Sequence, residues 1–392
     1  MMAGSETIIR KSIIDTNDKE RKRYFYKRVL FLLLAPIGYI LLFKCRNDRE
    51  FAEKVFAQKI FKGVSTGISF LTGKLPFSLA EASIVIGIPL VVFIIIAYFV
   101  VLKIRGGKMF KHFLLLLLDF CCIGSIVYFV YAYGCGANYY RYDLTDHLGL
   151  TVSESTQEEL EGLLTELAKK ATSLREGLTE DADGCYAFKG KDTELAEMAR
   201  KSYIELAKEY PIFGGNYPAP KAVYFSRFMS KMNLTGIYTC WTMEANVNVD
   251  IPDYSLASTM CHELAHLRGF IREDEANYIG YLACMASPEA ELKYSGTMMA
   301  LIYTGNALYA QDADSYIKIR EAYYSDEVMR DLIANSVYWK QFEEEKVAKI
   351  TEAANDTYLK ANGEEDGTKS YGRMVDLLLA QYKARKNSFT IR

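Results

Sequence analysis

Three long apolar runs set the first third of the chain apart from the rest: residues 29–43, 82–102 and 112–133. A helix that crosses a bilayer needs about 20 apolar residues, so the second and third runs are long enough and the first is short. Arg28 and Lys44 flank the first run, and their long side chains can extend from it to the interface. Buried core helices, the alternative, fit such continuous apolar runs poorly. The pattern therefore predicts three membrane spans.

Asp119 interrupts the third of these runs. A carboxylate inside a membrane span is costly and often marks a functional position. Asp119 lies in the first half of its run, where it would face either another helix or a lipid head group. A structural role is therefore favoured over a functional one.

The connection between the first two runs, residues 44–81, carries apolar residues near helical spacing beside several lysines. These apolar residues are Phe51, Val55, Phe56 and Ile60. The pattern fits a helix that lies on the membrane surface, and it fits a solvated connecting helix equally well.

Beyond the third run, the pattern becomes that of a globular domain. Leucines at helical spacing, with Glu and Lys on the opposite face, predict a helix over residues 157–175. Further helices are expected over residues 192–210, 273–286, 289–309, 312–324, 328–355 and 370–382, and residues 363–367 are expected to form a polar turn. Short alternating segments predict strands at residues 221–225, 236–241 and 244–250.

The predicted fold class is α+β, with a helical transmembrane anchor followed by a mostly helical domain that holds a small sheet. Residues 1–28 would form a cytoplasmic arm, residues 29–133 the three-span region, and residues 134–392 the soluble domain. Lysine and arginine concentrate in the arm and in residues 103–111, so the positive-inside rule places both on the cytoplasmic side. Three spans then put the soluble domain on the other side of the membrane.

Charge and cysteine content narrow the function classes. The net charge is −2, and the soluble part has no basic patch interleaved with aromatic residues, so no nucleic-acid partner is predicted. Five of the eight cysteines follow the third run, without the regular spacing of a disulfide framework. Cys185 and Cys240 form one possible bridge, whereas Cys261 and Cys284 fall on apolar helix faces and are expected in the core.

The strongest chemical signal is the pentapeptide from His262 to His266, with Glu263 between the two histidines. Residues four apart lie on one face of a helix, so both imidazoles can bind a single Zn²⁺ ion. The chain has only four histidines, and two of them fall here at metal-binding spacing. An ordinary amphipathic helix with incidental histidines is the less favoured alternative. Gly269 can adopt a positive φ and end this helix.

A third ligand is expected from the acidic segment that follows. After the turn at Gly269, either Glu273 or Glu275 can return to the metal, and Glu273 is favoured. Asn277 shares a helix face with Glu273, because the two are four residues apart. From that face, Asn277 is predicted to orient a ligand histidine through a hydrogen bond.

Two histidines, one carboxylate and an open position match catalytic zinc. Glu263 would then act as general base on a water activated by the metal and as proton shuttle to the leaving amine. The oxyanion that forms needs a further donor. Tyr371 and Arg373 are candidates, although both equally fit ordinary surface positions at a helix start. The strand at residues 244–250 fits either an edge strand that holds an extended peptide or a plain half-buried strand.

These segments also resemble a known family. The stretches from Trp241 to Asn248, from His262 to Phe270 and from Arg272 to Asn277 are similar to an uncharacterised bacterial membrane family, domain of unknown function 3810. The segments at residues 355–360 and 369–373 are similar as well. The resemblance spans most of the chain and implies a membrane-anchored, zincin-like domain in the bacterial cytoplasmic membrane.

The carboxylate segment also resembles that of gluzincin metallopeptidases, in which a glutamate ligand is followed four residues later by aspartate. Glu273 takes the ligand position, and Asn277 replaces the aspartate. The interval from His266 to Glu273 is shorter than in most gluzincins.

Two functions follow from these observations. The leading hypothesis is a membrane-anchored, zinc-dependent metallopeptidase that hydrolyses a peptide or protein outside the cytoplasm. The alternative is a non-catalytic membrane protein whose zinc site is structural and which serves as a sensor or assembly partner.

Overall fold

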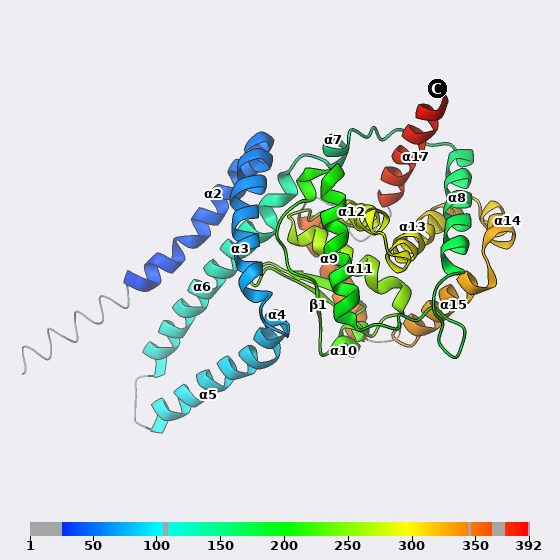
Figure 1. Ribbon diagram of the computed structural model, residues 1–392. Helices are drawn as coiled ribbons and strands as arrows, with labels where there is room; N and C mark the ends of the chain where they lie inside the picture. Colours follow the sequence, from blue (N-terminus) through cyan, green and yellow to red (C-terminus); the bar gives the residue numbers. More distant parts are fainter. Residues whose placement is uncertain (1–25, 105–108, 344–345, 363–372, 391–392) are drawn as a thin grey trace, which may run out of the picture.

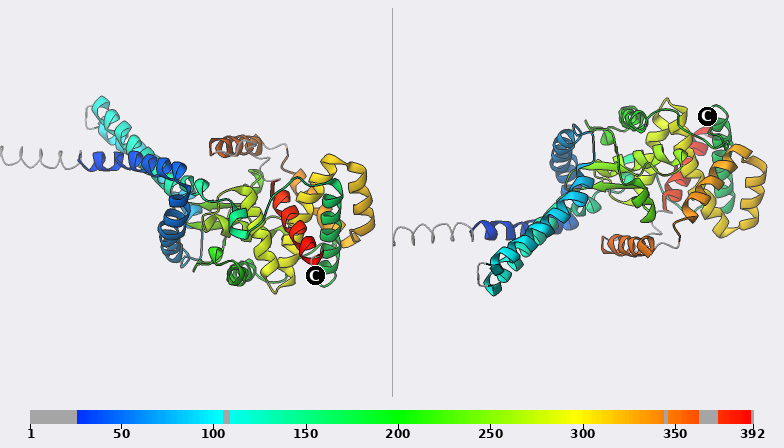
Figure 2. Two further views of the ribbon diagram at one scale, coloured as in Figure 1. Left: turned by 90° about the horizontal axis from the view of Figure 1, so that it is seen from above. Right: turned by 90° about the horizontal axis from the view of Figure 1, so that it is seen from below.

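The computed structural model describes residues 26–104, 109–343, 346–362 and 373–390. Three of its helices are long and apolar enough to cross a membrane: Tyr26–Asn47, Leu79–Ile104 and His112–Tyr140. They project from one side of a helical body (Figures 1 and 2). The first helix has 22 residues, so flanking residues make up for its short apolar run. The three predicted spans are therefore confirmed as helices of the required length and hydropathy.

The first and third of these helices pack against each other, through α2 (Leu34–Asn47) and α6 (Met109–Gly134). Arg28 donates two hydrogen bonds to Asp119, from Nε to Oδ1 at 2.7 Å and from Nη2 to Oδ2 at 3.0 Å. Of the two surroundings considered for Asp119, the structure therefore places it against another helix.

The connection between the first two spans packs against the C-terminal domain. It contains the π-helix η1 (Phe51–Phe61), α3 (Lys62–Thr72), α4 (Leu79–Ala82) and the π-helix η2 (Ser83–Gly87), which leads into α5 (Ile88–Ile104). Phe56 and Phe61 are buried in the same apolar core as the C-terminal domain, whereas Val55 and Ile60 are exposed. Both sequence interpretations, a membrane-surface helix and a solvated helix, therefore missed that this helix buries one face against protein.

A three-stranded sheet lies beside the central helices. It consists of β1 (Lys221–Ala222), β2 (Gly236–Thr239) and β3 (Glu244–Val247), in the order β1-β3-β2. β3 pairs parallel to β1 and antiparallel to β2, so its backbone is hydrogen-bonded on both sides. The interpretation of residues 244–250 as an edge strand is therefore wrong. Among the described strands, β1 and β2 are the two edges of the sheet, and all four residues of β3 are buried.

Helices make up most of the domain. They are η3 (Gly136–Tyr140), α7 (Leu144–Leu148), α8 (Gln157–Arg175), α9 (Asp192–Glu209), η4 (Pro211–Phe213), α10 (Ser226–Lys231), α11 (Asp253–Leu267), α12 (Glu273–Ala286), α13 (Ala290–Gln311), α14 (Ala313–Tyr323), α15 (Asp326–Lys340), α16 (Lys346–Ala361) and α17 (Met374–Thr390). A mostly helical fold with a small sheet is thus confirmed. α8 begins at a capping box in which Thr156 and Glu159 satisfy each other's backbone N–H groups.

Two helix predictions differ from the structure. The helix expected over residues 328–355 is divided into α15 and α16, because the chain turns after Lys340 to bury Phe342 beneath Arg227. α17 continues to Thr390, beyond the predicted end at residue 382, since no Gly or Pro follows to stop it. The predicted turn at residues 363–367 lies outside the described residues.

The centre of the domain is α11, which packs against α12, α13 and β3. Cys261 of α11 and Cys284 of α12 are fully buried, as expected of core residues. Cys185 and Cys240 are free thiols, so the possible bridge between them is not formed.

Candidate metal centre

The turn between α11 and α12 positions the candidate ligands. α11 ends where Gly269 adopts a φ of +84°, and the backbone N–H groups of Gly269 and Phe270 donate to carbonyls in the last turn of α11. The chain then reverses, and α12 packs closely against α11. A Cβ on Gly280 would lie 3.1 Å from the backbone nitrogen of His262, so the crossing of the two helices needs a glycine there.

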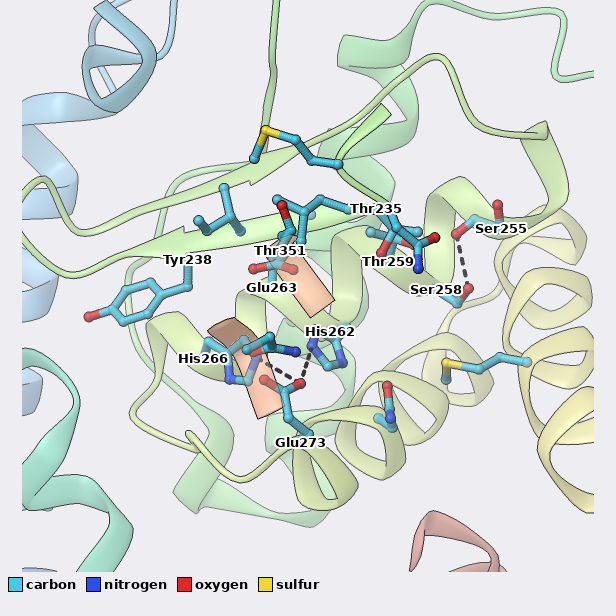
Figure 3. A pocket seen from close by; sticks show the side chains of 18 of the residues that line it. Thr235, Tyr238, Ser255, Ser258, Thr259, His262, Glu263, His266, Glu273 and Thr351 are labelled. Atoms are coloured by element: carbon cyan, nitrogen blue, oxygen red, sulfur yellow. Dashed lines mark hydrogen bonds and ion pairs between the residues drawn. The ribbon is translucent and has the colours of Figure 1, made fainter. Parts of the chain in front are cut away.

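His262, His266 and Glu273 converge at this crossing (Figure 3). One ligand atom from each lies within 4.8 Å of the other two. Glu273 Oε2 is 3.2 Å from His262 Nε2 and 3.5 Å from His266 Nε2. The structure thus brings all three predicted ligands together around one point, at the wall of a cavity.

The surroundings of the His266 ring also fit metal binding at this point. His266 Nδ1 lies 2.7 Å from the carbonyl oxygen of Phe270. When Nδ1 carries a proton, it donates to this carbonyl, and the lone pair of Nε2 faces Glu273. His262 Nδ1 is buried without a hydrogen-bond partner.

Burial and mutual charge shift the pKa values of the cluster. Burial lowers the pKa of His266, but the adjacent Glu273 carboxylate outweighs this and raises it to about 9. Burial raises the pKa of Glu273, but the two histidines outweigh it and hold that pKa well below its ordinary value. In the metal-free protein, an imidazolium therefore pairs with a carboxylate where a cation would otherwise sit.

Glu263 lies beside the cluster in the wall of the same cavity. Its side chain is buried, and Oε2 has no hydrogen-bond partner. Burial raises the pKa of Glu263 to about 7, despite the opposing positive charges of His262 and His266. A carboxyl group with this pKa can both accept and release a proton near neutral pH.

Glu275, the alternative third ligand, points away from the histidines. Its Oε1 accepts a hydrogen bond from the backbone N–H of Leu144 at 2.8 Å and contacts Arg272 Nη1 at 3.1 Å. This carboxylate therefore ties α12 to α7 and takes no part in the cluster.

Two supporting roles assigned from the sequence differ from the structure. Asn277 lines the cavity, but its Nδ2 contacts Tyr303 Oη at 3.4 Å, so the expected hydrogen bond to a histidine is not made. Arg373 does not line the cavity, because its guanidinium is drawn to the Asp274 carboxylate, with Nε 3.3 Å from Oδ2. Tyr371, the other candidate oxyanion donor, lies outside the described residues.

The cluster opens into a cavity of about 750 Å³. Its walls come from β2, α11, α12, α13 and α16, so they draw on segments far apart in the sequence. Sequence reasoning gave no site role to several of its residues, among them Gly236 and Tyr303. Gly236 of β2 lies against Glu263, and Tyr303 of α13 presents a hydroxyl beside Asn277. The predicted strand at residues 236–241 and the predicted helix over residues 289–309 include these two residues, but no local motif marks either as part of a site.

The fold and this site define a helical protein with three candidate membrane spans and a largely buried cluster of two histidines and a glutamate. The chain belongs to the family described as protein of unknown function (DUF3810), whose model matches residues 56–379. The match begins inside η1, which agrees with the packing of that helix into the domain. Comparison with curated proteins and with solved structures gives no match.

Proposed function

We propose that this protein is a membrane-anchored, zinc-dependent metallopeptidase with a zincin-like site. One observation carries the proposal: the ligand atoms of His262, His266 and Glu273 lie within 4.8 Å of one another at a cavity wall, beside the buried, partly unpaired carboxylate of Glu263. Two imidazoles and one carboxylate are a donor set of catalytic zinc sites, and the orphaned Oε2 of Glu263 is what a general base needs.

His262, His266 and Glu273 would hold the ion. When bound, zinc supplies a Lewis acid that acidifies water and polarises a carbonyl group. Glu263 would accept the proton of the attacking water and pass it to the leaving amine, since its raised pKa suits both transfers. The Phe270 carbonyl would keep His266 in the tautomer that presents Nε2 to the ion.

The sheet supports a peptide as substrate. β2 is one of the two described edge strands, and its residues Gly236, Ile237 and Tyr238 line the cavity beside Glu263. An extended peptide could add to this edge by main-chain hydrogen bonds, which would position its amide group near the cluster. We therefore assign the role of holding an extended peptide to β2, and not to residues 244–250 as the sequence suggested.

The alternative, a non-catalytic protein with a structural zinc site, requires a fourth protein ligand. Among the described residues the cluster has three members, and Glu275 is held by Leu144 and Arg272. The geometry therefore supports the enzyme better than the sensor or assembly partner.

The proposed location is the bacterial cytoplasmic membrane, with the cavity on its outer side. The basic arm and the basic connection at residues 103–111 favour the cytoplasm, and both spans adjoining that connection extend away from the body (Figure 1). The peptide or protein substrate would then be extracytoplasmic.

The proposal can be tested with the full chain purified in a neutral detergent. Zinc content is measured by mass spectrometry, and cleavage is assayed with a mixed peptide library. We expect about one zinc per chain, and a loss of about 10²- to 10⁴-fold in cleavage rate for Glu263→Gln with zinc retained. Glu321→Gln, an exposed change on α14, is the matched control. Full cleavage by Glu263→Gln would reject Glu263 as the base, and absence of zinc would reject the metal centre.

A further inference from the structure

A second cavity, of about 380 Å³, lies where η1 meets the C-terminal domain. Basic and polar side chains dominate its lining, and none of the lining residues is an aspartate or glutamate. The lining residues are Ala57, Gln58, Lys62, Arg141, His147, Pro211, Ile212 and Arg268. Gln58 and Pro211 are exposed, so the cavity reaches the surface. Three of these side chains carry a positive charge, and the charges that oppose them determine what the cavity can hold.

The carboxylate of Glu53 pairs with one of these three cations, Arg141. Arg141 donates to both of its oxygens, from Nε to Oε2 and from Nη2 to Oε1, each at 2.9 Å. Gln58, which lies five residues further along the π-helix, donates from Nε2 to Glu53 Oε1 at 3.0 Å. His147 Nε2 lies 3.4 Å from Glu53 Oε2 without forming a hydrogen bond. Glu53 therefore neutralises Arg141, and within the described chain no ion pair joins it to Lys62 or Arg268.

Arg268 is a buried guanidinium without a carboxylate partner among the described residues. It donates to two backbone carbonyls, those of Phe213 and Leu264, both at 2.8 Å. Its guanidinium stacks over the rings of Tyr203 and Tyr217, at 3.8 and 4.5 Å from their centroids. Carbonyls and aromatic faces solvate a cation but carry no formal negative charge.

Lys62, the first residue of α3, adds a third positive charge. Its side chain is half-buried at the cavity wall, and no carboxylate within the described chain pairs with it. Burial, together with the nearby charges of Arg268 and Arg141, lowers the pKa of Lys62. Lys62 and Arg268 thus place two positive charges without a carboxylate partner, among the described residues, around a cavity of about 380 Å³. Burying unpaired charge is costly unless an anion compensates it.

We propose that this cavity is a binding site for a phosphate-class oxyanion, held by Lys62, Arg141 and Arg268. A tetrahedral phosphate has several acceptor oxygens. They can accept from the Lys62 ammonium and from the guanidinium N–H groups that Glu53 and the backbone carbonyls leave free. Gln58 supplies a neutral donor at the mouth of the cavity. The site is distinct from the metal cluster, because the two cavities share no lining residue.

The phosphate can come from free phosphate or from a phospholipid head group. Arg141 follows directly on the third candidate span, and η1 follows closely on the first. The cavity therefore lies near the domain ends of two spans, where head groups of a bilayer would gather. Both sources present the same oxyanion, and two probes separate them.

The test uses the full chain in neutral detergent and follows its melting temperature. Sodium phosphate is titrated at constant ionic strength, and dihexanoyl phosphatidic acid is titrated in parallel with dihexanoylglycerol, which lacks the phosphate. We expect a saturable rise in melting temperature with phosphate, with phosphatidic acid or with both, and no rise with dihexanoylglycerol. The probe with the higher affinity identifies the source.

Variants at Lys62 decide whether the effect arises in this cavity. Lys62→Met should weaken the apparent affinity about tenfold or more, since one charge-assisted contact is lost. Lys62→Arg, which keeps the charge, and Lys59→Met, which removes an exposed lysine from the same segment, should retain it. Lys62→Glu should abolish the response without lowering the melting temperature of the unliganded protein, because its carboxylate would face Arg141 and Arg268. No saturable rise with either probe, or the same response in Lys62→Met, would overturn the proposal.

Discussion

Gly236 of β2 lies directly against Glu263 of α11: a Cβ atom on Gly236 would stand 2.4 Å from Glu263 Oε1. This contact lets the edge strand pass close to the proposed general base. It also places β2 against one side of the Glu263 carboxylate.

Gly236→Ala should therefore displace Glu263 and leave the metal ligands in place. A misplacement of about 1 Å can cost about 10²-fold in rate, so we expect a loss of that order in kcat with zinc content unchanged. The measurement is peptide cleavage together with metal analysis. Gly63→Ala, where an added Cβ meets no atom within 4 Å, is the matched control. Full activity in Gly236→Ala would show that this contact does not position the base.

Glu273 and Glu275 lie two residues apart, yet their carboxylates have different partners, so the two should respond differently to the same change. Glu273→Gln should weaken zinc binding by more than about 100-fold, which exceeds the loss typical of residues that only support a ligand. Glu275→Gln should keep zinc but destabilise the fold by about 1–3 kcal/mol, because the buried Leu144 N–H loses a charged acceptor. Zinc titration against a competing chelator and thermal melts measure both effects. Equal zinc affinity in the two variants would contradict the assignment.

Much of the fold could be predicted because it is encoded locally. α8 and α12 begin and end where the sequence predicts, since each combines periodic apolar residues with clear end signals. The packing of η1 could not be predicted in this way. Its apolar residues beside lysines look the same whether the partner is lipid, water or protein, and π-helical winding changes which residues share a face.

The candidate site shows the same division. His262, His266 and Glu273 come together through one helix, one turn and the start of the next helix, so their spacing suffices to predict them. Gly236 and Tyr303 reach the site from β2 and α13, and only the tertiary fold shows that they are near. Arg373 was chosen as a polar residue at a helix start, but the nearby Asp274 carboxylate determines its position.

Zinc affinity should depend on pH through His266. Its pKa is raised to about 9 in the metal-free protein by Glu273, whereas a zinc ligand must be the neutral imidazole. Below pH 9, each zinc bound therefore displaces a proton from His266, and affinity should rise about tenfold per pH unit up to about pH 9. Because the folded-state pKa is raised, the imidazolium stabilises the metal-free fold below about pH 6.5, and that contribution is lost as pH rises through about 9.

Chelator competition between pH 6 and 10, in buffers of different ionisation enthalpy, measures both the affinity and the protons released. An affinity that levels off near the ordinary histidine pKa of about 6.5 would mean that Glu273 does not hold a proton on His266.

Tyr303, which lines the cavity, is a candidate for the missing oxyanion donor. Its hydroxyl lies at the cavity wall beside Asn277, and burial together with the Glu273 charge raises its pKa to about 12. The phenol therefore keeps its proton throughout the neutral range and can donate it to developing negative charge. Tyr303→Phe should lower kcat by about 10²- to 10³-fold, with little change in KM and with zinc retained.

Tyr309→Phe, an exposed change on the same helix, controls for effects on α13. If Tyr303 only holds Asn277 in place through their contact, Asn277→Ala should lower kcat as much as Tyr303→Phe does. If Tyr303 is the donor, Asn277→Ala should retain most of the rate, because it removes a partner and leaves the hydroxyl in place.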